Sequence, residues 1–153
     1  MIQSFTDGAF RVLKPGGRLI GINTNPFLST RSDFEASHQY SVKYTTDKET
    51  CEEGDPLHIH IIGDGWEAKF DNYYWKPETY EKAFLSSGFS RFRWVPLEVT
   101  SDEDGYWAEW LKKTPLICFE AIKSTGESWN SNYQMMLTKI PITKQQIFSF
   151  YNH

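Results

Sequence analysis

The sequence predicts an α/β fold, and three observations carry that prediction. Residues 1–13 place apolar side chains three and four positions apart, which is the spacing of a helix with one buried face. A Pro-Gly-Gly turn leads from this helix into an apolar run at residues 18–23, which has the length and composition of a strand. Between residues 26 and 75 the apolar period shortens to two, which is typical of antiparallel strands. A chain of 153 residues can bury one principal core around these elements.

The antiparallel region is predicted to contain three strands. Gly63-Asp64-Gly65 joins the last two, since glycine and aspartate accept the positive φ of a tight hairpin. Residues 45–56 are polar and rich in Asp, Glu and Lys, and we expect them to form a mobile loop. The residues that alternate on the apolar face are Tyr40, Val42 and Tyr44 in the first strand, Leu57, Ile59 and Ile61 in the second, and Trp66, Ala68 and Phe70 in the third.

The rest of the chain returns to alternating helices and strands. Pro77 fits the first position of a helix and Gly88 fits its C-terminal cap, and residues 89–97 follow as a strand. A short helix is predicted around Trp107 and Trp110, whose rings we expect in the core, and a buried strand at residues 115–123. Beyond residue 124 the sequence has no clear period, and one strand and a terminal helix are the expectation.

Composition excludes several classes of function. The formal charge is -4 and the Lys and Arg residues are scattered, so we expect no nucleic-acid partner. No run reaches the roughly 18 apolar residues of a membrane span, and no signal peptide is recognisable. Cys51 and Cys118 lack the density of a disulfide scaffold, so free thiols in the cytoplasm are expected.

Three motifs, in this order, resemble a known family: RVLKPGGRLIG, KPETYEKAFLSSGF and YWAEWLKKTPLICFEAIK. They are similar to the C-terminal half of class I S-adenosylmethionine-dependent methyltransferases, in particular small-molecule enzymes of the toxoflavin-synthesis type. The resemblance implies the C-terminal portion of a Rossmann-like methyltransferase sheet, strands five to seven, with an antiparallel β insertion. It implies a partial methyltransferase domain at residues 1–123, a substrate-lid insertion at 26–75 and a C-terminal extension at 124–153.

The same resemblance implies S-adenosylmethionine as the cofactor of the complete family enzyme. Family members hold it with a glycine-rich loop after their first strand, and this sequence has no strand, Gly-x-Gly-x-x-Gly and helix in succession. We therefore expect no cofactor-binding residues and no cofactor for this chain alone. The chain is expected to be a truncated enzyme, inactive alone, whose strand at residues 18–23 has an edge covered by the C-terminal tail, by a second copy in a homodimer or by a missing N-terminal half.

Candidate catalytic residues are few. His58 and His60 stand two apart on a predicted strand, so both rings lie on one face, opposite the apolar positions. A solvated sheet face, a general base and a pair of metal ligands are all compatible with that pattern, and the solvated face is favoured. No third ligand has recognisable spacing beside them, so no metal is expected. Glu120 lies in an apolar strand and needs a partner, for which Arg91 and Arg93 on the neighbouring strand are candidates.

A small-molecule acceptor would be held by amide and aromatic side chains. Asn23 and Asn25 end the first predicted strand, at the sheet edge where α/β proteins place their ligands, but turn formation before Pro26 also explains them and is favoured. The aromatic side chains suit a planar substrate, and core packing is the competing explanation. The candidate substrate-binding residues are Asn23, Asn25, Tyr40, Trp66, Tyr73, Tyr74 and Trp75.

Two other functions stay open. The first is a non-catalytic binding or oligomerisation module derived from a methyltransferase fold. The second is a hot-dog or cystatin-like binding domain built around the antiparallel strands, in which residues 18–23, 89–97 and 116–123 would not share one sheet.

Overall fold

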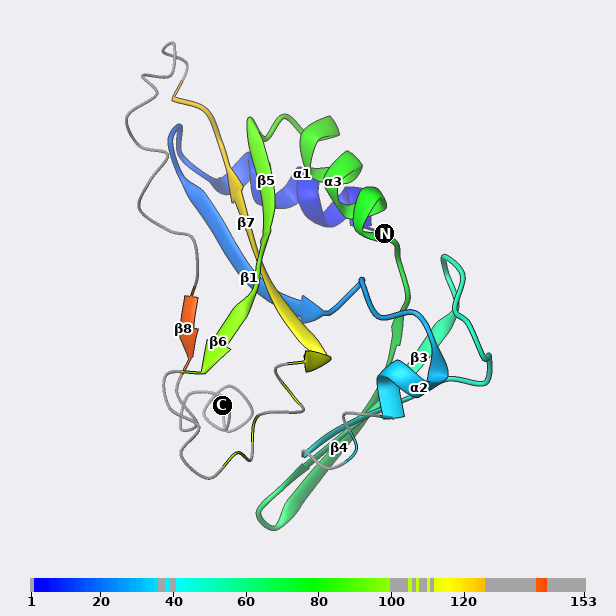
Figure 1. Ribbon diagram of the computed structural model, residues 1–153. Helices are drawn as coiled ribbons and strands as arrows, with labels where there is room; N and C mark the ends of the chain where they lie inside the picture. The colour runs from blue at the N-terminus through cyan, green and yellow to red at the C-terminus, as the bar shows by residue number, and fades with distance from the viewer. Residues whose placement is uncertain are drawn as a thin grey trace. The chain divides into compact units, whose positions relative to one another are not determined.

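The computed structural model of the chain describes residues 2–35, 38, 41–99, 105, 107, 110, 112–125 and 140–142. These residues form an α/β fold that divides into two compact units (Figure 1). Of the described residues, those within Met1–Asn23, Pro77–Pro96 and Ile117–Ile140 form the first unit, and those within Thr24–Lys76, Leu97–Leu116 and Pro141–His153 form the second.

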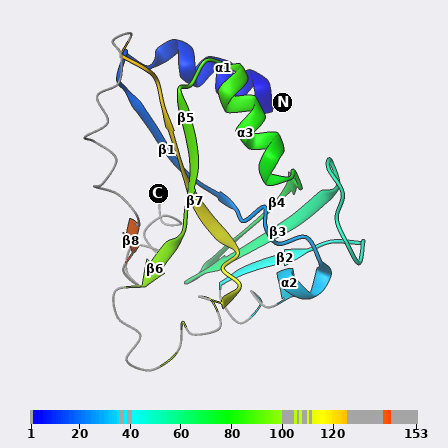
Figure 2. The same ribbon diagram turned by 45° about the horizontal axis from the view of Figure 1, so that its top comes forward.

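The first unit is a three-stranded sheet with two helices on one of its faces. The strands are β1 (Arg18–Thr24), β7 (Leu116–Ile122) and β5 (Arg91–Val95), in the order β1-β7-β5. Figures 1 and 2 show the helices α1 (Ile2–Val12) and α3 (Pro77–Ser86) on the same side of these strands. The three segments that a hot-dog or cystatin-like fold would separate therefore share one sheet, which counts against that alternative.

Strand β7 runs antiparallel to both of its neighbours. It pairs with β5 in a register that sets Glu120 opposite Arg93. The end of β7 lies beside the start of β1, where the Lys123 amide donates to the Gly17 carbonyl at 2.9 Å. The start of β7 lies beside the end of β1, where the Asn25 amide donates to the Pro115 carbonyl at 2.9 Å. Strands β1 and β5 thus run in one direction, with β7 reversed between them.

The core of the first unit is mostly aromatic. Phe84 of α3 stacks on Phe92 of β5, with ring centroids 4.6 Å apart, and contacts Phe119 of β7 at 5.3 Å. Gly21 of β1 leaves the space that Phe119 occupies, since a Cβ atom at residue 21 would lie 2.5 Å from the Phe119 ring. A larger residue at this point in β1 would displace the ring, so the close approach of β1 to β7 depends on glycine.

Most of the predicted elements of this unit are confirmed, and one is wrong in its extent. The predicted strand at residues 89–97 is divided into β5 and β6 (Leu97–Val99). Proline lacks an amide hydrogen, and Pro96 stands at the break. Strand β6 pairs instead with β8 (Ile140–Ile142). The predicted helix near Trp107 and Trp110 lies mostly outside the described residues, but both indoles are buried, with centroids 5.6 Å apart.

The second unit contains the predicted antiparallel sheet, which is confirmed. Its strands are β2 (Val42–Thr45), β3 (Pro56–Gly63) and β4 (Trp66–Tyr73), in the order β2-β3-β4. Gly65 has a φ of 76°, as a tight hairpin requires. The short helix α2 (Arg31–Glu35) was not predicted, because five residues are too few to show a helical period.

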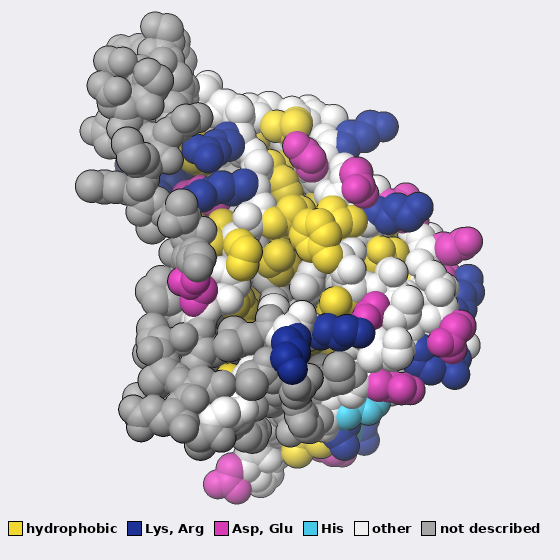
Figure 3. All heavy atoms as spheres, viewed as in Figure 1, with side chains coloured by type: hydrophobic (Ala, Val, Ile, Leu, Met, Phe, Trp, Pro, Cys, Tyr) yellow, Lys and Arg dark blue, Asp and Glu magenta, His cyan; other side chains and the backbone are white. Residues whose placement is uncertain are grey.

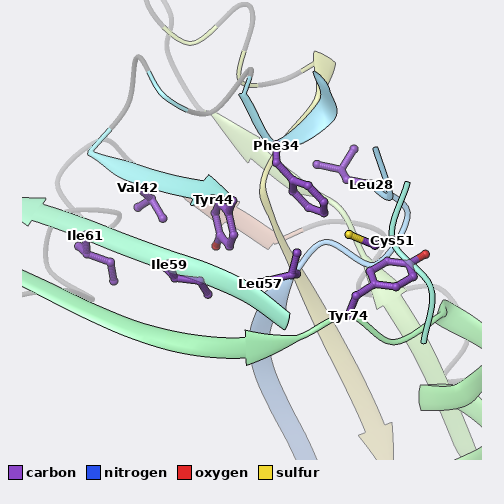
Figure 4. Close-up of a cluster of buried hydrophobic side chains, with 9 residues drawn as sticks. All are labelled: Leu28, Phe34, Val42, Tyr44, Cys51, Leu57, Ile59, Ile61 and Tyr74. Atoms are coloured by element: carbon purple, nitrogen blue, oxygen red, sulfur yellow. The ribbon is translucent and has the colours of Figure 1, made fainter. Parts of the chain in front are cut away.

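One apolar face of this sheet forms the core of the second unit. Figure 4 shows Phe34 of α2 near Tyr44 of β2, and their ring centroids lie 6.2 Å apart. The predicted mobile loop contributes Cys51, whose amide donates to the Ser29 carbonyl at 2.7 Å. The buried side chains of this core are Leu28, Phe34, Val42, Tyr44, Cys51, Leu57, Ile59, Ile61 and Tyr74.

Cys51 and Cys118 are both free, as predicted, and the structure buries both. Within the described residues, every helix is too short or too polar to span a membrane.

Candidate functional site

Asn23 lies at the carboxyl end of β1, where the sequence places a candidate ligand contact. Its side chain hydrogen-bonds Tyr80 of α3, and both residues belong to the first unit. The Tyr80 ring packs edge-on against Trp94 of β5, with centroids 5.3 Å apart. Tyr80 therefore interacts with both Asn23 of β1 and Trp94 of β5.

The environment of Tyr80 favours its neutral form. Burial of the phenol raises its pKa, and the hydrogen bond with Asn23 opposes that effect without cancelling it. The group is therefore a neutral phenol at physiological pH, able to donate or to accept a hydrogen bond.

Asn25 is buried and its carboxamide is used within the turn after β1. Its Nδ2 donates to the Thr114 carbonyl at 2.8 Å, and its Oδ1 accepts from the Phe27 amide at 3.1 Å. These contacts agree with the turn interpretation of Asn25, because its side chain replaces backbone groups in the hydrogen bonds of the turn that contains Pro26. A substrate contact for Asn25 stays a prediction.

The carboxyl end of β4 lies beside the same turn, within the second unit. Asn72 Nδ2 donates to Thr24 Oγ1 at 3.2 Å, and the Tyr74 hydroxyl donates to the Pro26 carbonyl at 3.3 Å. Two candidate substrate residues, Tyr73 and Tyr74, are adjacent in the sequence but differ in their surroundings. Tyr74 is part of the buried core, whereas the Tyr73 ring is exposed.

The remaining aromatic candidates are spread along the hairpin. The Trp66 indole lies across Gly63, where an added Cβ would come within 2.0 Å of the ring, and packs against the core of the second unit. Trp75 follows Tyr74 and is partly buried. Tyr40 lies outside the described residues. The structure therefore brings Tyr74 to Pro26, the residue after Asn25, but the described candidates of this unit are not all gathered at one place.

His58 and His60 lie on the solvent-facing side of β3, as their spacing predicts. His58 Nδ1 lies 2.7 Å from Asp71 Oδ1, and His60 Nε2 lies 2.8 Å from Glu67 Oε2, both across the β3–β4 pair. The hydrogen bond between His58 and Asp71 raises the pKa of His58 and outweighs the opposing effect of burial. No three His, Cys, Asp or Glu side chains of the described part are grouped to hold a metal ion. A catalytic role for either histidine stays a prediction.

The surface seen in Figure 3 has no single basic area. Dark blue Lys and Arg side chains alternate with magenta Asp and Glu side chains around a central group of apolar side chains. Histidine side chains lie beside side chains of both charges on that face. The picture fits the scattered charges of the sequence.

Sequence reasoning missed Tyr80 and Trp94 as possible site residues. Tyr80 shares a helix face with Ala83 and Phe84, so its position indicates core packing alone. Only the fold brings its hydroxyl to the end of β1. A tyrosine on an otherwise apolar helix face, whose hydroxyl needs a partner when buried, was the available signal.

Comparison with known proteins gives a likeness in fold alone. No family model matches the chain, and no curated protein matches it. The structure is similar to that of a candidate S-adenosylmethionine-dependent methyltransferase from Listeria monocytogenes, with a TM-score of 0.47 and 16% identity over 81% of this chain and 55% of that chain. It is also similar to an S-adenosylmethionine-dependent methyltransferase from Clostridium acetobutylicum, with a TM-score of 0.39 and 14% identity over 80% of this chain and 50% of that chain. The chain thus spans about half the length of both structures.

Proposed function

We propose that this chain is the acceptor-binding part of an S-adenosylmethionine-dependent methyltransferase for a small molecule, of the toxoflavin-synthesis type. The proposal rests on one arrangement of elements. The chain passes from helix α1 through Lys-Pro-Gly-Gly into strand β1, and strand β7 lies between β1 and β5 and runs antiparallel to both. A helix, a strand and a reversed strand formed from these motifs support the proposal. The proposal makes the chain the C-terminal half of the catalytic domain.

Methyl transfer from a sulfonium is an in-line displacement that depends chiefly on alignment of donor and acceptor. In this proposal the chain binds and orients the acceptor and shields it from water. The S-adenosylmethionine site belongs to residues outside the chain, so the chain alone is inactive. We also propose a cytoplasmic location, which agrees with two free, buried thiols.

The proposed acceptor is a planar, polar heterocycle. Exposed rings offer stacking surfaces and carboxamides offer both donors and acceptors, which is the combination that such a molecule requires. Within the second unit, Tyr73 supplies an exposed ring at the end of β4, and Trp75 supplies a partly buried ring two positions later. The histidines of β3 stay weaker candidates, because their partners are side chains of the neighbouring strand.

Titration with lumazine, a planar bicyclic nitrogen heterocycle, tests this class of acceptor. We expect saturable binding to the chain, read from lumazine fluorescence, and weaker binding by Trp75→Ala. A chain that stays folded by circular dichroism but leaves lumazine fluorescence unchanged would contradict the proposed acceptor class. Lys76→Gln, a change at an exposed neighbour, is the matched control.

The alternative, a non-catalytic assembly module, is favoured by the edge of the first sheet. Among the described strands, β1 has a neighbour on one side alone, and Ile20 on this strand is 53% exposed. Exposed strand edges pair readily with other strands. We propose that a second copy of the chain or a separate N-terminal half covers this edge. Size-exclusion chromatography with light scattering tests the homodimer, which Ile20→Lys should dissociate; a monomeric wild-type chain would contradict it.

A further inference from the structure

We infer that the edge of β4 that faces away from β3, called the β4 edge below, is a homodimer interface. In this interface β4 pairs antiparallel with the β4 strand of a second copy, and Ala68 lies on the two-fold axis. The β4 edge belongs to the second unit and is distinct from the edge of β1. The inference goes beyond the proposed function, since the contact involves neither a cofactor nor an acceptor.

The backbone of β4 has one side available for pairing. Among the described strands, β4 pairs with β3 alone. Just beyond β4, the Tyr74 amide donates to the Asp55 carbonyl at 2.8 Å, and the Gly54 amide donates to the Tyr74 carbonyl at 2.8 Å. Tyr74 thus points its backbone groups to the β3 side, and this direction alternates along an antiparallel strand. The amides and carbonyls of Glu67 and Lys69 therefore point away from β3, as pairing with a further strand requires.

The apolar face of the sheet continues onto β4 beyond the buried core. Ile59 of β3 belongs to that core, and Figure 4 shows it on the core side of the strand. Phe70 of β4 stands directly opposite Ile59, yet 48% of its surface is exposed. Residues directly opposite in antiparallel strands share one face of the sheet. Trp66 and Ala68, at alternate positions of β4, lie on the same face as Phe70 and are partly buried.

The residues around Ala68 are complementary to a second copy of themselves. Glu67 and Lys69 place opposite charges on either side of Ala68, and Trp66 and Phe70 place an aromatic ring two positions away on each side. In an antiparallel pair centred on Ala68, Glu67 lies opposite the partner's Lys69. In the same pair, Trp66 lies opposite the partner's Phe70. Two-fold symmetry forms each of these contacts twice, and opposite charges and paired rings both stabilise a sheet.

The backbone permits this register. Glu67 and Lys69 both point their backbone groups outward, so each can form a hydrogen-bonded pair with its counterpart in the second copy. Ala68 lies between them and falls at a non-hydrogen-bonded position, where the two Cα atoms approach to about 4.5 Å. A small side chain suits this close approach.

The two neighbouring registers are less favourable. A pair centred on Lys69 would place Glu67 opposite the partner's Asp71, and like charges directly opposite each other destabilise a sheet. A pair centred on Phe70 would give one aromatic pair within β4 in place of two. The charges and the rings of β4 therefore favour the register centred on Ala68.

Disulfide cross-linking tests the register. Ala68→Cys places two thiols on the two-fold axis, at a Cα separation that suits a disulfide. Mild oxidation of the full chain should convert Ala68→Cys to a covalent dimer on non-reducing gel electrophoresis. The wild type should run as a single chain on that gel, since both of its cysteines are buried. Cross-linking of Phe70→Cys in place of Ala68→Cys, or of neither variant, would overturn the inference.

Charge reversal tests the cross-strand pairs. Glu67→Lys sets a lysine opposite the partner's Lys69, and Lys69→Glu sets a glutamate opposite the partner's Glu67, so either change should weaken the dimer about tenfold. A mixture of the two variants restores opposite charges at both positions and should dimerise about as tightly as wild type. Sedimentation velocity over a concentration series measures each dissociation constant. Glu81→Lys, the same change of charge at an exposed position of α3, should have no effect.

The outcomes separate the β4 edge from the edge of β1. Ile20→Lys should leave the Ala68→Cys cross-link unchanged, because Ile20 lies in the first unit. A dimer that Ile20→Lys dissociates and that neither charge reversal weakens would overturn this inference and leave the proposed function intact. A wild-type chain that is monomeric at every concentration of the series would also overturn it. Recovery of the dimer on mixing excludes misfolding as the cause of its loss in the single variants.

Discussion

Arg93 of β5 donates from Nε to Glu120 Oε2 of β7 at 2.6 Å, and Arg18 of β1 reaches the other oxygen of the same carboxylate at 3.3 Å. Glu120 is buried, with 4% of its surface exposed, and these two arginines are the partners that compensate its burial. The sequence offers Arg91 and Arg93 on the neighbouring strand as candidate partners, and in the structure the partner is Arg93. The contact with Arg18 was not predicted, because it depends on β1 lying beside β7.

The two arginines should differ in their effect on stability. Arg93→Met should lower the free energy of unfolding by about 3 kcal/mol, because it removes the closer partner of a buried carboxylate. Arg18→Met should cost less than about 1 kcal/mol, since the Arg18 side chain is 51% exposed and its contact is longer. Urea unfolding of both variants checks this order. Equal losses, or a larger loss for Arg18→Met, would contradict it.

Gly21 should tolerate no side chain. Gly21→Ala places a Cβ within 2.5 Å of the Phe119 ring, so the ring or β1 must shift, and the free energy of unfolding should fall by about 2 kcal/mol. Gly8→Ala is the control, because no atom lies within 4 Å of the added Cβ. Alanine is the better helix former, so Gly8→Ala should stabilise α1 slightly. Thermal unfolding of the two variants distinguishes these opposite effects.

His58 should titrate above its ordinary value of 6.5, because Asp71 stabilises the imidazolium by a hydrogen bond. The folded-state pKa exceeds the unfolded one, so the pair stabilises the hairpin fully below pH 6.5 and loses that effect as pH rises through the folded-state pKa. Proton NMR of the His58 ring against pH measures the shift. Asp71→Asn should return the pKa of His58 toward 6.5. An unchanged titration in Asp71→Asn would show that Asp71 is not the cause.

Asp33 should contribute an acid-dependent part of the stability. Burial alone would raise its pKa, but hydrogen bonds from Lys113 and from the Thr30 hydroxyl and amide outweigh burial and lower the pKa of Asp33 to about 2. The folded-state pKa is depressed, so this stabilisation is present above pH 3.8 and is lost as pH falls from there to about 2.

Asp33→Asn tests this contribution. The substitution should lower the free energy of unfolding by about 1 kcal/mol at pH 6 and should make little difference at pH 2. Urea unfolding at the two pH values measures the gap between wild type and variant. If the difference in free energy of unfolding between wild type and Asp33→Asn were the same at pH 6 and pH 2, the ionised Asp33 carboxylate would not be the cause of that difference.

Local patterns predicted most of the elements because each element buries one face. The alternation of Leu57, Ile59 and Ile61 with two histidines indicated both the strand and its solvent-facing side, and the buried core confirms the apolar side. The break at Pro96 was overlooked because the apolar pattern continues across it into Leu97. A missing amide hydrogen ends the pairing there even though the side chains favour a strand.

The candidate site was less accessible to sequence reasoning, since it depends on contacts between distant segments. Asn23 and Tyr80 stand 57 positions apart in the sequence, and only the packing of α3 on the sheet brings them together. Asn25 illustrates the opposite case. Its hydrogen bonds stay within the turn and residue 114, as the turn interpretation expects. Residue type and position alone could not separate these two asparagines.

Isothermal titration calorimetry with S-adenosylmethionine tests the central proposal most directly. The account assigns the donor site to residues outside this chain, so the purified chain should release no heat of binding with S-adenosylmethionine while it still binds lumazine. Stoichiometric binding of S-adenosylmethionine to the chain alone, at micromolar concentration or below, would contradict it.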